Sequence, residues 1–561
     1  MTQMDGQMLR SQAQTVEREQ GAAKALAWLD SELTKGKPSA DLWNFAGNVA
    51  MRAQQAGDAA MRFGKAAKSD PKSLEYAINH AIALSAHGDN PSALKALHPH
   101  EQAGANDQRY CSVRANAARG AGALKEAAHW YDAALRLNPK HLKALNGRAR
   151  VAIERAEPDA LARFDHALTI DSGNADLWLG KAQALDVNGD TAGARIIAQQ
   201  LVDQAPAWTE SLKFMAQLRL GAGEEDFTDH YRTAVDTVPQ DPNVLSDWIT
   251  QLAGLDYANE AADIAAEARL RFPNQLYFTL LEAVNAGAAG DESRAEEIFA
   301  SLEFGGIDRQ LHEARHRIRR KEFDRAETLL DAVIQTEPWS ISAWALRGII
   351  WRCTGDGRAD WLHEQAGLYC ALPLHNAEKV LPAAITKLHE LHDNSPLPLG
   401  QSLRGGTQTR GNLFDRMEPE FAALKNAILT TAAAYWNDLP DTDFAHPMLR
   451  HRKRSLDMLG SWSVRLSGGG DHHTSHIHPQ GLVSSALYLE VPEGDATEDE
   501  QAGWLEIGRS PADLQLDLPP LAMVEPKPGH LALFPSTLYH GTRPFGAGQR
   551  MTVAFDLVSS E

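Results

Sequence analysis

The chain has 561 residues, 43% of them hydrophobic and 23% charged, which is the composition of a folded globular protein rather than of a disordered or fibrous one. Lys and Arg total 55 against 74 Asp and Glu, and the formal net charge of −19 disfavours nucleic acids and anionic membranes as main partners, because both bind through cationic side chains. No stretch approaches the ~20 apolar residues of a membrane-spanning helix, and the first residues lack the apolar core of a secretion signal, so we expect a cytoplasmic protein.

The first two thirds of the chain repeat with a period of about 34 residues. Prolines that follow a polar or acidic turn residue are separated by about one or two such periods, at Pro71, Pro139, Pro206, Pro239, Pro273 and Pro338. Small and aromatic residues recur before these turns, as in Ala127, Tyr131 and Ala134 before Pro139. Small residues at such positions let two helices approach closely, so the pattern predicts stacked pairs of helices.

Three tryptophans, Trp43, Trp178 and Trp344, take equivalent places in their repeat units, where we expect them to pack between paired helices. Spacing and residue types together resemble the tetratricopeptide repeat family. The resemblance implies an α-solenoid over residues 21–375, after an N-terminal extension over 1–20. Its concave groove is a candidate surface for a protein or peptide partner.

The pattern changes after about residue 375. We expect a loop rich in Pro and Gly over 392–414, followed by an amphipathic helix over 418–436. Beyond it, short runs alternate apolar and polar residues between turns: SWSVRLS, LVSSALYLEVP, GWLEIG, HLALFPS and RMTVAFDLV. Such runs predict an antiparallel β-sandwich or jelly roll over residues 376–561, and the fold class is therefore multidomain, α then β.

Four of the 22 histidines lie in the segment DHHTSHIHPQG, residues 471–481. On a strand, alternate residues face the same way, so His476 and His478 can direct two imidazoles to one point. We expect a later strand to end at His540 and the next strand to begin at Arg550. Two histidines from one strand and a third from another predict a metal site with His476, His478 and His540 as ligands.

Several motifs occur in the order found in the Fe(II)- and 2-oxoglutarate-dependent oxygenases: QSLRGGTQT, SWSVRLSGGG, HIHPQG, PKPGHLALFPSTLYHGT and RMTVAFD. The chain therefore resembles, over about residues 395 to 558, the bacterial 2OG-Fe(II) oxygenases that are often fused to tetratricopeptide repeats. The resemblance implies a double-stranded β-helix that uses Fe(II), 2-oxoglutarate and O2. It also implies that Arg550 grips the distal carboxylate of 2-oxoglutarate, with Thr552 and Tyr488 close to the same cosubstrate.

The ligand motif departs from the usual triad of this family, because His478 stands where a carboxylate is usual. Three neutral imidazoles leave the whole charge of the metal uncompensated, which favours an anionic chelator such as 2-oxoglutarate but also suits zinc. His478 is therefore either a ligand or a residue just outside the ligand set. Glu506 and Asp471 are alternative carboxylate ligands, although neither lies at the family spacing.

Other polar residues near these motifs are candidates for weaker reasons. Arg404 and Gln408, in the unusual loop SLRGGTQT, are candidate contacts to substrate or cosubstrate. Arg465 alternates with apolar residues and would need an anion if it pointed inward. His472 and His473 are expected in a loop, facing solvent or the entrance of the site.

The function that these observations favour is an Fe(II)- and 2-oxoglutarate-dependent dioxygenase that hydroxylates a protein or peptide substrate presented by the repeats. Two alternatives remain open. The chain is an interaction scaffold whose β-domain is inactive, or it is a cupin-like metalloenzyme with three histidines that does not use 2-oxoglutarate. The cupin alternative is weakened because cupins usually place a Glu soon after the HxH motif, and the segment PQGLVSS has none.

Overall fold

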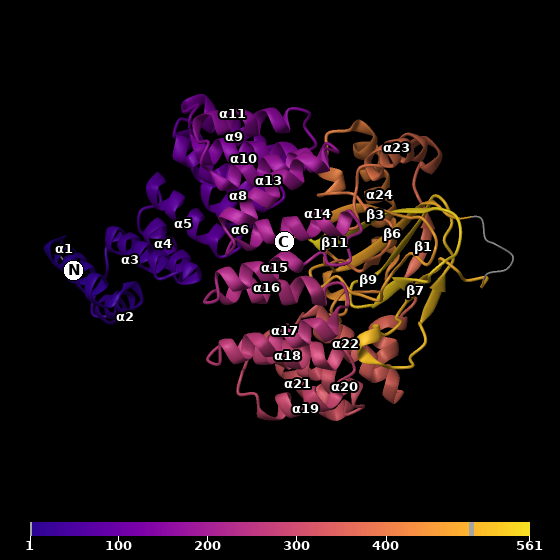
Figure 1. Cartoon of the computed structure of the whole chain (residues 1–561). Coiled ribbons are helices and arrows are strands. Elements are labelled where there is room, and N and C mark those ends of the chain that lie inside the picture. Colours follow the sequence, from indigo (N-terminus) through magenta and orange to yellow (C-terminus); the bar gives the residue numbers. More distant parts are fainter. Residues whose placement is uncertain (1–2, 493–498, 561) are drawn as a thin grey trace. The chain divides into compact units, whose positions relative to one another are not determined.

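The computed structural model describes residues 3–492 and 499–560, and the chain divides into two compact units, Met1–Ala184 and Leu185–Glu561 (Figure 1). Within the described ranges, no helix combines the length and the apolar character needed to cross a bilayer. The structure confirms the predicted fold class, an α-solenoid followed by an antiparallel β-domain. The domain boundary near residue 375 stays a prediction, because the last solenoid helices and the β-domain share one compact unit.

The first unit consists of helices, most of which pack on the next one: α1 (Gln3–Gln20), α2 (Ala22–Leu33), α3 (Ala40–Arg52), α4 (Ala56–Ser69), α5 (Leu74–Ala86), α6 (Asn90–Leu97), α7 (Glu101–Gly104), α8 (Gln108–Gly120), α9 (Leu124–Leu137), α10 (Leu142–Glu154), α11 (Ala160–Ile170) and the first part of α12 (Ala175–Val187). Several begin at a side chain that accepts a hydrogen bond from the first turn. Ser39 does so for α3, Ser73 for α5 and Asp107 for α8. These caps satisfy amide groups that the helix itself leaves unpaired.

The small residues of the repeat are required by helix packing. A Cβ atom added to Gly47 of α3 would lie 2.7 Å from the ring of Phe63 on α4, closer than real Cβ contacts. Gly147 of α10 meets the ring of Tyr131 on α9 in the same way. These repeats therefore pair a glycine with an aromatic ring, which explains the spacing seen in the sequence.

The tryptophans of the repeat are packing residues, as predicted. Trp344 is buried, and its indole Nε1 donates to the carbonyl of Pro338, 2.9 Å away in the preceding turn. Trp178 makes the equivalent bond of 2.8 Å to the carbonyl of Ser172. Trp43 packs beside the hydrophobic cluster of its own repeat. The indoles of Trp344 and Trp178 thus fix the turn to the helix that follows it.

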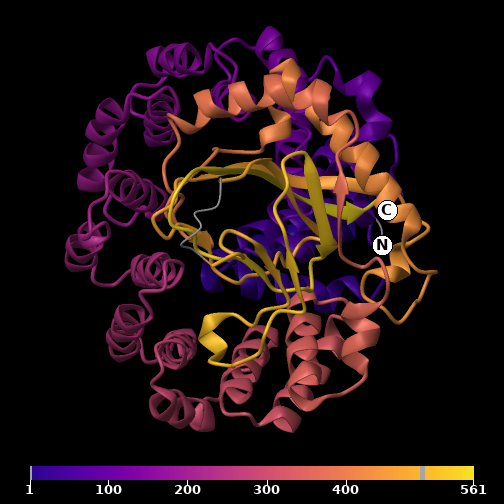
Figure 2. The ribbon, with the colours of Figure 1, turned by 90° about the vertical axis from the view of Figure 1, so that its right-hand side faces the viewer.

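The second unit continues the solenoid with α13 (Thr191–Gln204), α14 (Thr209–Gly221), α15 (Asp229–Thr237), α16 (Pro242–Ala253), α17 (Ala258–Arg271), α18 (Leu276–Ala288), α19 (Glu292–Ser301), α20 (Ile307–Arg319), α21 (Phe323–Thr336) and α22 (Ile341–Thr354). Figure 2 shows these helices curving around the β-sheets. The inner side of this part of the solenoid therefore faces the β-domain of the same unit.

Antiparallel strands form the core of the β-domain. The largest sheet has the order β1-β9-β6-β11-β4-β3, a second sheet has the order β10-β7-β8, and β2 pairs with β5. Their bounds are β1 (Cys370–Pro373), β2 (Leu403–Arg404), β3 (Thr407–Gln408), β4 (Leu456–Leu466), β5 (His472–His473), β6 (Val483–Glu490), β7 (Leu505–Ile507), β8 (Ala522–Val524), β9 (His530–Pro535), β10 (His540–Thr542) and β11 (Arg550–Ser559).

The two faces of the large sheet have different neighbours. On one face, apolar residues of β6, β9 and β11 pack against α23 (Ala377–His392) and α24 (Pro419–Asp438). β11 contributes Met551, Val553, Phe555 and Leu557 to this core. Its alternate residues, Arg550, Thr552, Ala554 and Asp556, line a cavity on the other face. The period of two along β11 thus separates core residues from cavity residues.

Two expectations about the ligand strands are wrong. β9 ends at Pro535, and after a turn closed by the bond from the Leu538 amide to the Pro535 carbonyl, His540 begins β10 instead of ending a strand. The chain changes sheets there, since β9 pairs in the large sheet and β10 in the second. His476 and His478 lie outside the named strands, and only His476 forms an isolated bridge, to His540.

The segment around the predicted boundary also differs from the sequence pattern. β1 falls inside the range predicted for the solenoid and pairs with β9, far along the sequence. α23 precedes the predicted loop despite an internal Pro382, and β2 and β3 form within that loop. The helix predicted over 418–436 is confirmed as α24. Short strands with distant partners leave no local periodicity, which is why the pattern did not reveal them.

Candidate metal centre

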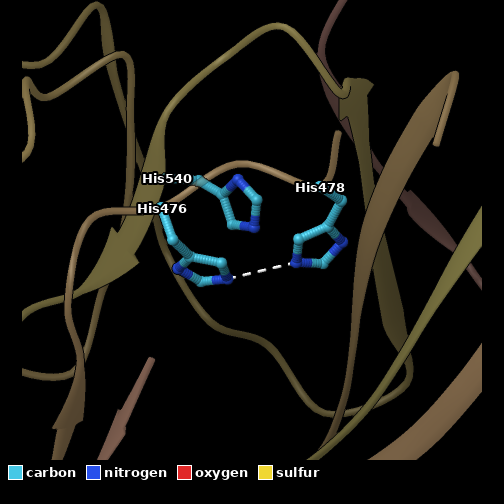
Figure 3. Close-up of side chains that lie close together, drawn as sticks. All are labelled: His476, His478 and His540. Atoms are coloured by element: carbon cyan, nitrogen blue, oxygen red, sulfur yellow. Dashed lines mark hydrogen bonds between the residues drawn. The ribbon is translucent and has the colours of Figure 1, made fainter. Parts of the chain in front are cut away.

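Three imidazoles, those of His476, His478 and His540, point toward one another beside strands of the β-domain (Figure 3). The Nε2 atoms of His476 and His478 are 3.1 Å apart, and the ring centroids of His476 and His540 are 4.3 Å apart. One possible ligand atom from each of the three residues lies within 4.8 Å of the others. The sequence-predicted ligands are thus brought together, as a group with the composition of a transition-metal site.

The backbone fixes the relation between two of these residues. The His476 amide donates to the His540 carbonyl at 3.0 Å, and the His540 amide donates to the His476 carbonyl at 2.9 Å. This reciprocal pair replaces the strand on which the sequence prediction relied. It holds the two side chains next to each other although the residues are 64 positions apart.

The outer ring nitrogens show how the imidazoles are oriented. Nδ1 of His476 lies 2.8 Å from the Thr474 carbonyl, and Nδ1 of His540 lies 3.1 Å from the Leu538 carbonyl. A carbonyl oxygen only accepts hydrogen bonds, so Nδ1 carries the proton in both rings. The lone pair of each ring is then on Nε2, which is the atom directed at the common point.

Asp556 is a candidate site residue that the sequence analysis did not single out. Its Oδ1 atom lies 2.6 Å from His478 Nδ1 and accepts a second hydrogen bond of 3.0 Å from the Ser484 hydroxyl. The residue is 7% exposed and borders the same cavity as the imidazoles. The HxH motif contains no carboxylate, but the carboxylate of Asp556 is hydrogen-bonded to its second histidine, His478. The available signal was the single acidic residue in the run RMTVAFDLV, at a position that alternates with its apolar residues.

Burial keeps two of the imidazoles neutral. Burial and the neighbouring His478 lower the pKa of His476 to about 3. Burial, with the imidazoles of His476 and His478 beside it, also lowers the pKa of His540 well below its ordinary value. A neutral imidazole is the form that binds a metal, so the donor set fits a divalent cation near neutral pH.

Arg550 is a buried cation with no carboxylate partner among the residues that the structure describes. The residue is 2% exposed, and within residues 3–492 and 499–560 no carboxylate contributes to its environment. Its guanidinium carbon lies 5.3 Å from the centre of the Tyr488 ring, and the neutral Tyr488 hydroxyl is its polar neighbour, while Arg550 Nε has no hydrogen-bond partner among the described residues. Burial lowers the pKa of Arg550, which reflects the cost of an uncompensated charge. The residues therefore fit an anionic ligand.

A cavity of about 370 Å³ connects the two groups. Its wall includes all three histidines, Arg550, Thr552 and Asp556. Trp462 of β4 adds an apolar surface, with its ring 5.5 Å from that of His478. Tyr488 does not border the cavity but lies against Arg550. The space is suited to a small anion between the guanidinium and the imidazoles.

Two of the weaker candidates have their partners outside the cavity. Arg404 forms an ion pair with Asp256, in the turn after α16, with its Nη2 atom 2.5 Å from the carboxylate. Arg465 pairs with Asp393 at 2.9 Å. Neither arginine borders the cavity, and each has a carboxylate partner elsewhere, so a role for either in binding substrate or cosubstrate stays a prediction. Gln408, in contrast, borders the cavity.

Of the other candidate residues, only His473 borders the cavity; His472, Glu506 and Asp471 do not. His473 borders the cavity and stacks on His476 at 5.9 Å, whereas Nδ1 of His472 bonds to the Gly470 carbonyl. The carboxylate of Glu506 pairs with Arg509, and that of Asp471 accepts from a backbone amide. Neither acid belongs to the three-histidine group.

Comparisons with known proteins agree with both resemblances found in the sequence. Residues 460–556 match the family model "Putative 2OG-Fe(II) oxygenase", and residues 158–218 match a tetratricopeptide repeat model. The comparison with curated proteins gives no match.

Among the similar solved structures, two are named as tetratricopeptide repeat proteins. One is a tetratricopeptide repeat protein from Parabacteroides merdae, with 16% identity over 43% of this chain and 97% of that chain and a TM-score of 0.33. Another is a thermophilic tetratricopeptide repeat protein from Thermus thermophilus, with 20% identity, 32% and 100% coverage and a TM-score of 0.29. A third is MamA from Desulfovibrio magneticus, with 17% identity, 30% and 96% coverage and a TM-score of 0.28. The chain therefore combines tetratricopeptide repeats with a segment that matches the oxygenase family.

Proposed function

We propose that this protein is an Fe(II)- and 2-oxoglutarate-dependent dioxygenase that hydroxylates a protein or peptide. The observation that carries the proposal is the pairing of two features in one cavity. Three imidazoles converge on one side, and a buried guanidinium that lacks a carboxylate partner among the described residues lies on another. A metal alone would explain the imidazoles, but only an additional anion explains Arg550.

Each residue has a distinct part in this proposal. His476, His478 and His540 hold the metal through Nε2, and Asp556 orients His478 and offsets part of the metal charge. Arg550 holds the distal carboxylate of 2-oxoglutarate, with the Thr552 hydroxyl beside it on β11.

Fe(II) and 2-oxoglutarate, when bound, would supply the electrons that activate O2, which is the oxidant, for attack on an unreactive C–H bond, and 2-oxoglutarate would be oxidised to succinate and CO2. The protein supplies placement and a shielded cavity. Trp462 and the sheet behind it limit access of water to His478, and the backbone bonds between His476 and His540 keep the imidazoles in place before any ligand arrives. Three neutral imidazoles would also bind zinc, so zinc is a competing occupant of the site. The experiment below distinguishes the proposed function from a zinc site because it measures binding of 2-oxoglutarate.

The substrate class follows from the repeats, which are protein-binding modules. In the second unit, several side chains of the solenoid are already used to contact the β-domain, including Asp256, Arg315 and Arg352. We therefore assign capture of a polypeptide substrate to the repeats of the first unit, α3 to α12.

Binding of 2-oxoglutarate under anaerobic conditions tests the proposal. Calorimetry on the Fe(II)-loaded full chain should show binding that is lost in Arg550→Ala and kept in Arg465→Ala, which removes an arginine that is ion-paired outside the cavity. Iron without any affinity for 2-oxoglutarate would favour the cupin-like alternative. A purified protein that takes up neither would favour an interaction scaffold.

A further inference from the structure

Tyr539, the residue before the ligand His540, is tied to the solenoid. Arg315 of α20 donates from Nη1 to the Tyr539 hydroxyl at 2.9 Å. The same guanidinium holds both carboxylate oxygens of Asp513, with its Nη2 atom 2.5 and 2.7 Å away from them. Tyr539 is 4% exposed, so this network is closed off from solvent on the tyrosine side. A bidentate arginine in such a place defines position closely.

Apolar packing joins the same elements. Tyr539 and Leu514 belong to one hydrophobic cluster with Ile318 of α20 and Trp344 of α22. Ile477, which lies between the ligands His476 and His478, packs against this cluster. Both chain segments that carry the imidazoles therefore rest on the last repeats of the solenoid.

The backbone around Tyr539 gives a third connection. The Gly508 amide, just after β7, donates to the Tyr539 carbonyl at 2.6 Å. Arg352 of α22 in turn donates to the carbonyls of Gly508 and Pro519. Side chains of α20 and α22 thus hold the second sheet from two directions.

We propose that α20 and α22 support the chain segments that carry the three histidines, and that Arg315 is a positioning residue that acts on His540 through Tyr539. The identity of the metal rests on the proposed function. The repeats near the C-terminal end of the solenoid are then part of the enzyme and do more than carry a substrate. Since partners just outside a ligand set typically change metal affinity by about 10- to 100-fold, loss of the Arg315 contacts should weaken metal binding measurably.

The test uses the full chain with Co²⁺ as a spectroscopic probe for the site. Arg315→Met keeps the length of the side chain but removes its donors, and Tyr539→Phe removes only the accepting hydroxyl. Arg294→Met is the matched control, because Arg294 has similar exposure and forms its ion pairs with Glu282 and Asp263 inside the solenoid. We expect Co²⁺ affinity to fall about 10-fold in Arg315→Met, less in Tyr539→Phe and not at all in the control.

Thermal melts accompany each titration, so that Tyr539→Phe carries the test if Arg315→Met unfolds. Wild-type affinity in folded Arg315→Met and Tyr539→Phe, with loss of binding in His540→Ala, would overturn this inference and leave the proposed function intact. Failure of the wild-type chain to bind Co²⁺ or Fe(II) would remove the proposed function itself, and the inference with it.

Discussion

Nδ1 of His478 and a carboxylate oxygen of Asp556 are 2.6 Å apart, the shortest polar contact that the structure gives the three-histidine group with a side chain. Asp556 lies on β11, on the same face of the strand as Arg550. One strand therefore provides both the cation of the cavity and the carboxylate that contacts His478. In the proposed metal centre, the negative charge that a ligating carboxylate would supply comes from Asp556, which lies behind His478.

Removal of Asp556 should weaken metal binding without abolishing it. In Asp556→Ala we expect Fe(II) affinity to fall by about 10- to 100-fold, because His478 loses its orienting partner. Asp556→Asn, which keeps an acceptor oxygen but no charge, should fall between this variant and wild type. Chelator competition measures the affinities. Asp457→Ala, at an exposed position on β4, is the control, and equal losses in both alanine variants would refute the role of Asp556.

Single ligand variants should separate the true ligands from their neighbours. We expect purified His476→Ala and His540→Ala to contain little iron by elemental analysis, because each removes one of only three donors in the described group. His472→Ala should retain its iron, since that ring bonds to the Gly470 carbonyl outside the group. Iron loss in His472→Ala to the same extent would show that the segment folds differently.

Without a bound anion, the buried charge of Arg550 should destabilise the folded protein. Arg550→Met is expected to melt at or above the wild-type temperature, because replacing an uncompensated buried charge by an apolar side chain is neutral or stabilising. Arg317→Met provides the contrast. Arg317 is equally buried but pairs with Glu296 and Glu313, so its loss should cost about 3 to 5 kcal/mol. A large destabilisation in Arg550→Met would mean that its charge already has a partner.

Helix packing in the repeats gives a prediction independent of the metal. Gly147→Ala should destabilise the chain by about 1 to 3 kcal/mol, because the added methyl group meets the ring of Tyr131. Gly173→Ala is the control, since its new Cβ would have only a distant contact with Asp171 at 3.9 Å. Denaturant unfolding measures both. Equal effects would contradict the close glycine-to-ring packing.

Local patterns were sufficient for the repeats and for the cavity face of β11. The family resemblance named Arg550 and Thr552, and period-two alternation along β11 places both on the cavity face together with Asp556, so the alternation could have identified Asp556 as well. The sequence also predicted that His476 and His540 lie close together. A reciprocal pair of backbone hydrogen bonds brings them together, and not the strands that were expected.

Contacts between distant segments were not accessible from the sequence. The arginines of the SLRGGTQT and SWSVRL motifs look alike as candidates, yet Arg404 finds its carboxylate 148 residues away in the solenoid. Arg315 likewise meets Asp513 across 198 residues. Neither partner follows from periodicity or spacing, because both depend on how the solenoid meets the β-domain within the second unit.

The central claim is that the cavity binds 2-oxoglutarate and a metal together and consumes the former. The most direct measurement is succinate formation from 2-oxoglutarate by the full chain under O2, with and without Fe(II), alongside Arg550→Ala, His540→Ala and the control Arg465→Ala. We predict Fe(II)-dependent succinate for wild type and Arg465→Ala, and a loss of at least about 10-fold in the other two. Fe(II)-loaded wild-type protein that forms no succinate, or forms as much in Arg550→Ala, would contradict the account.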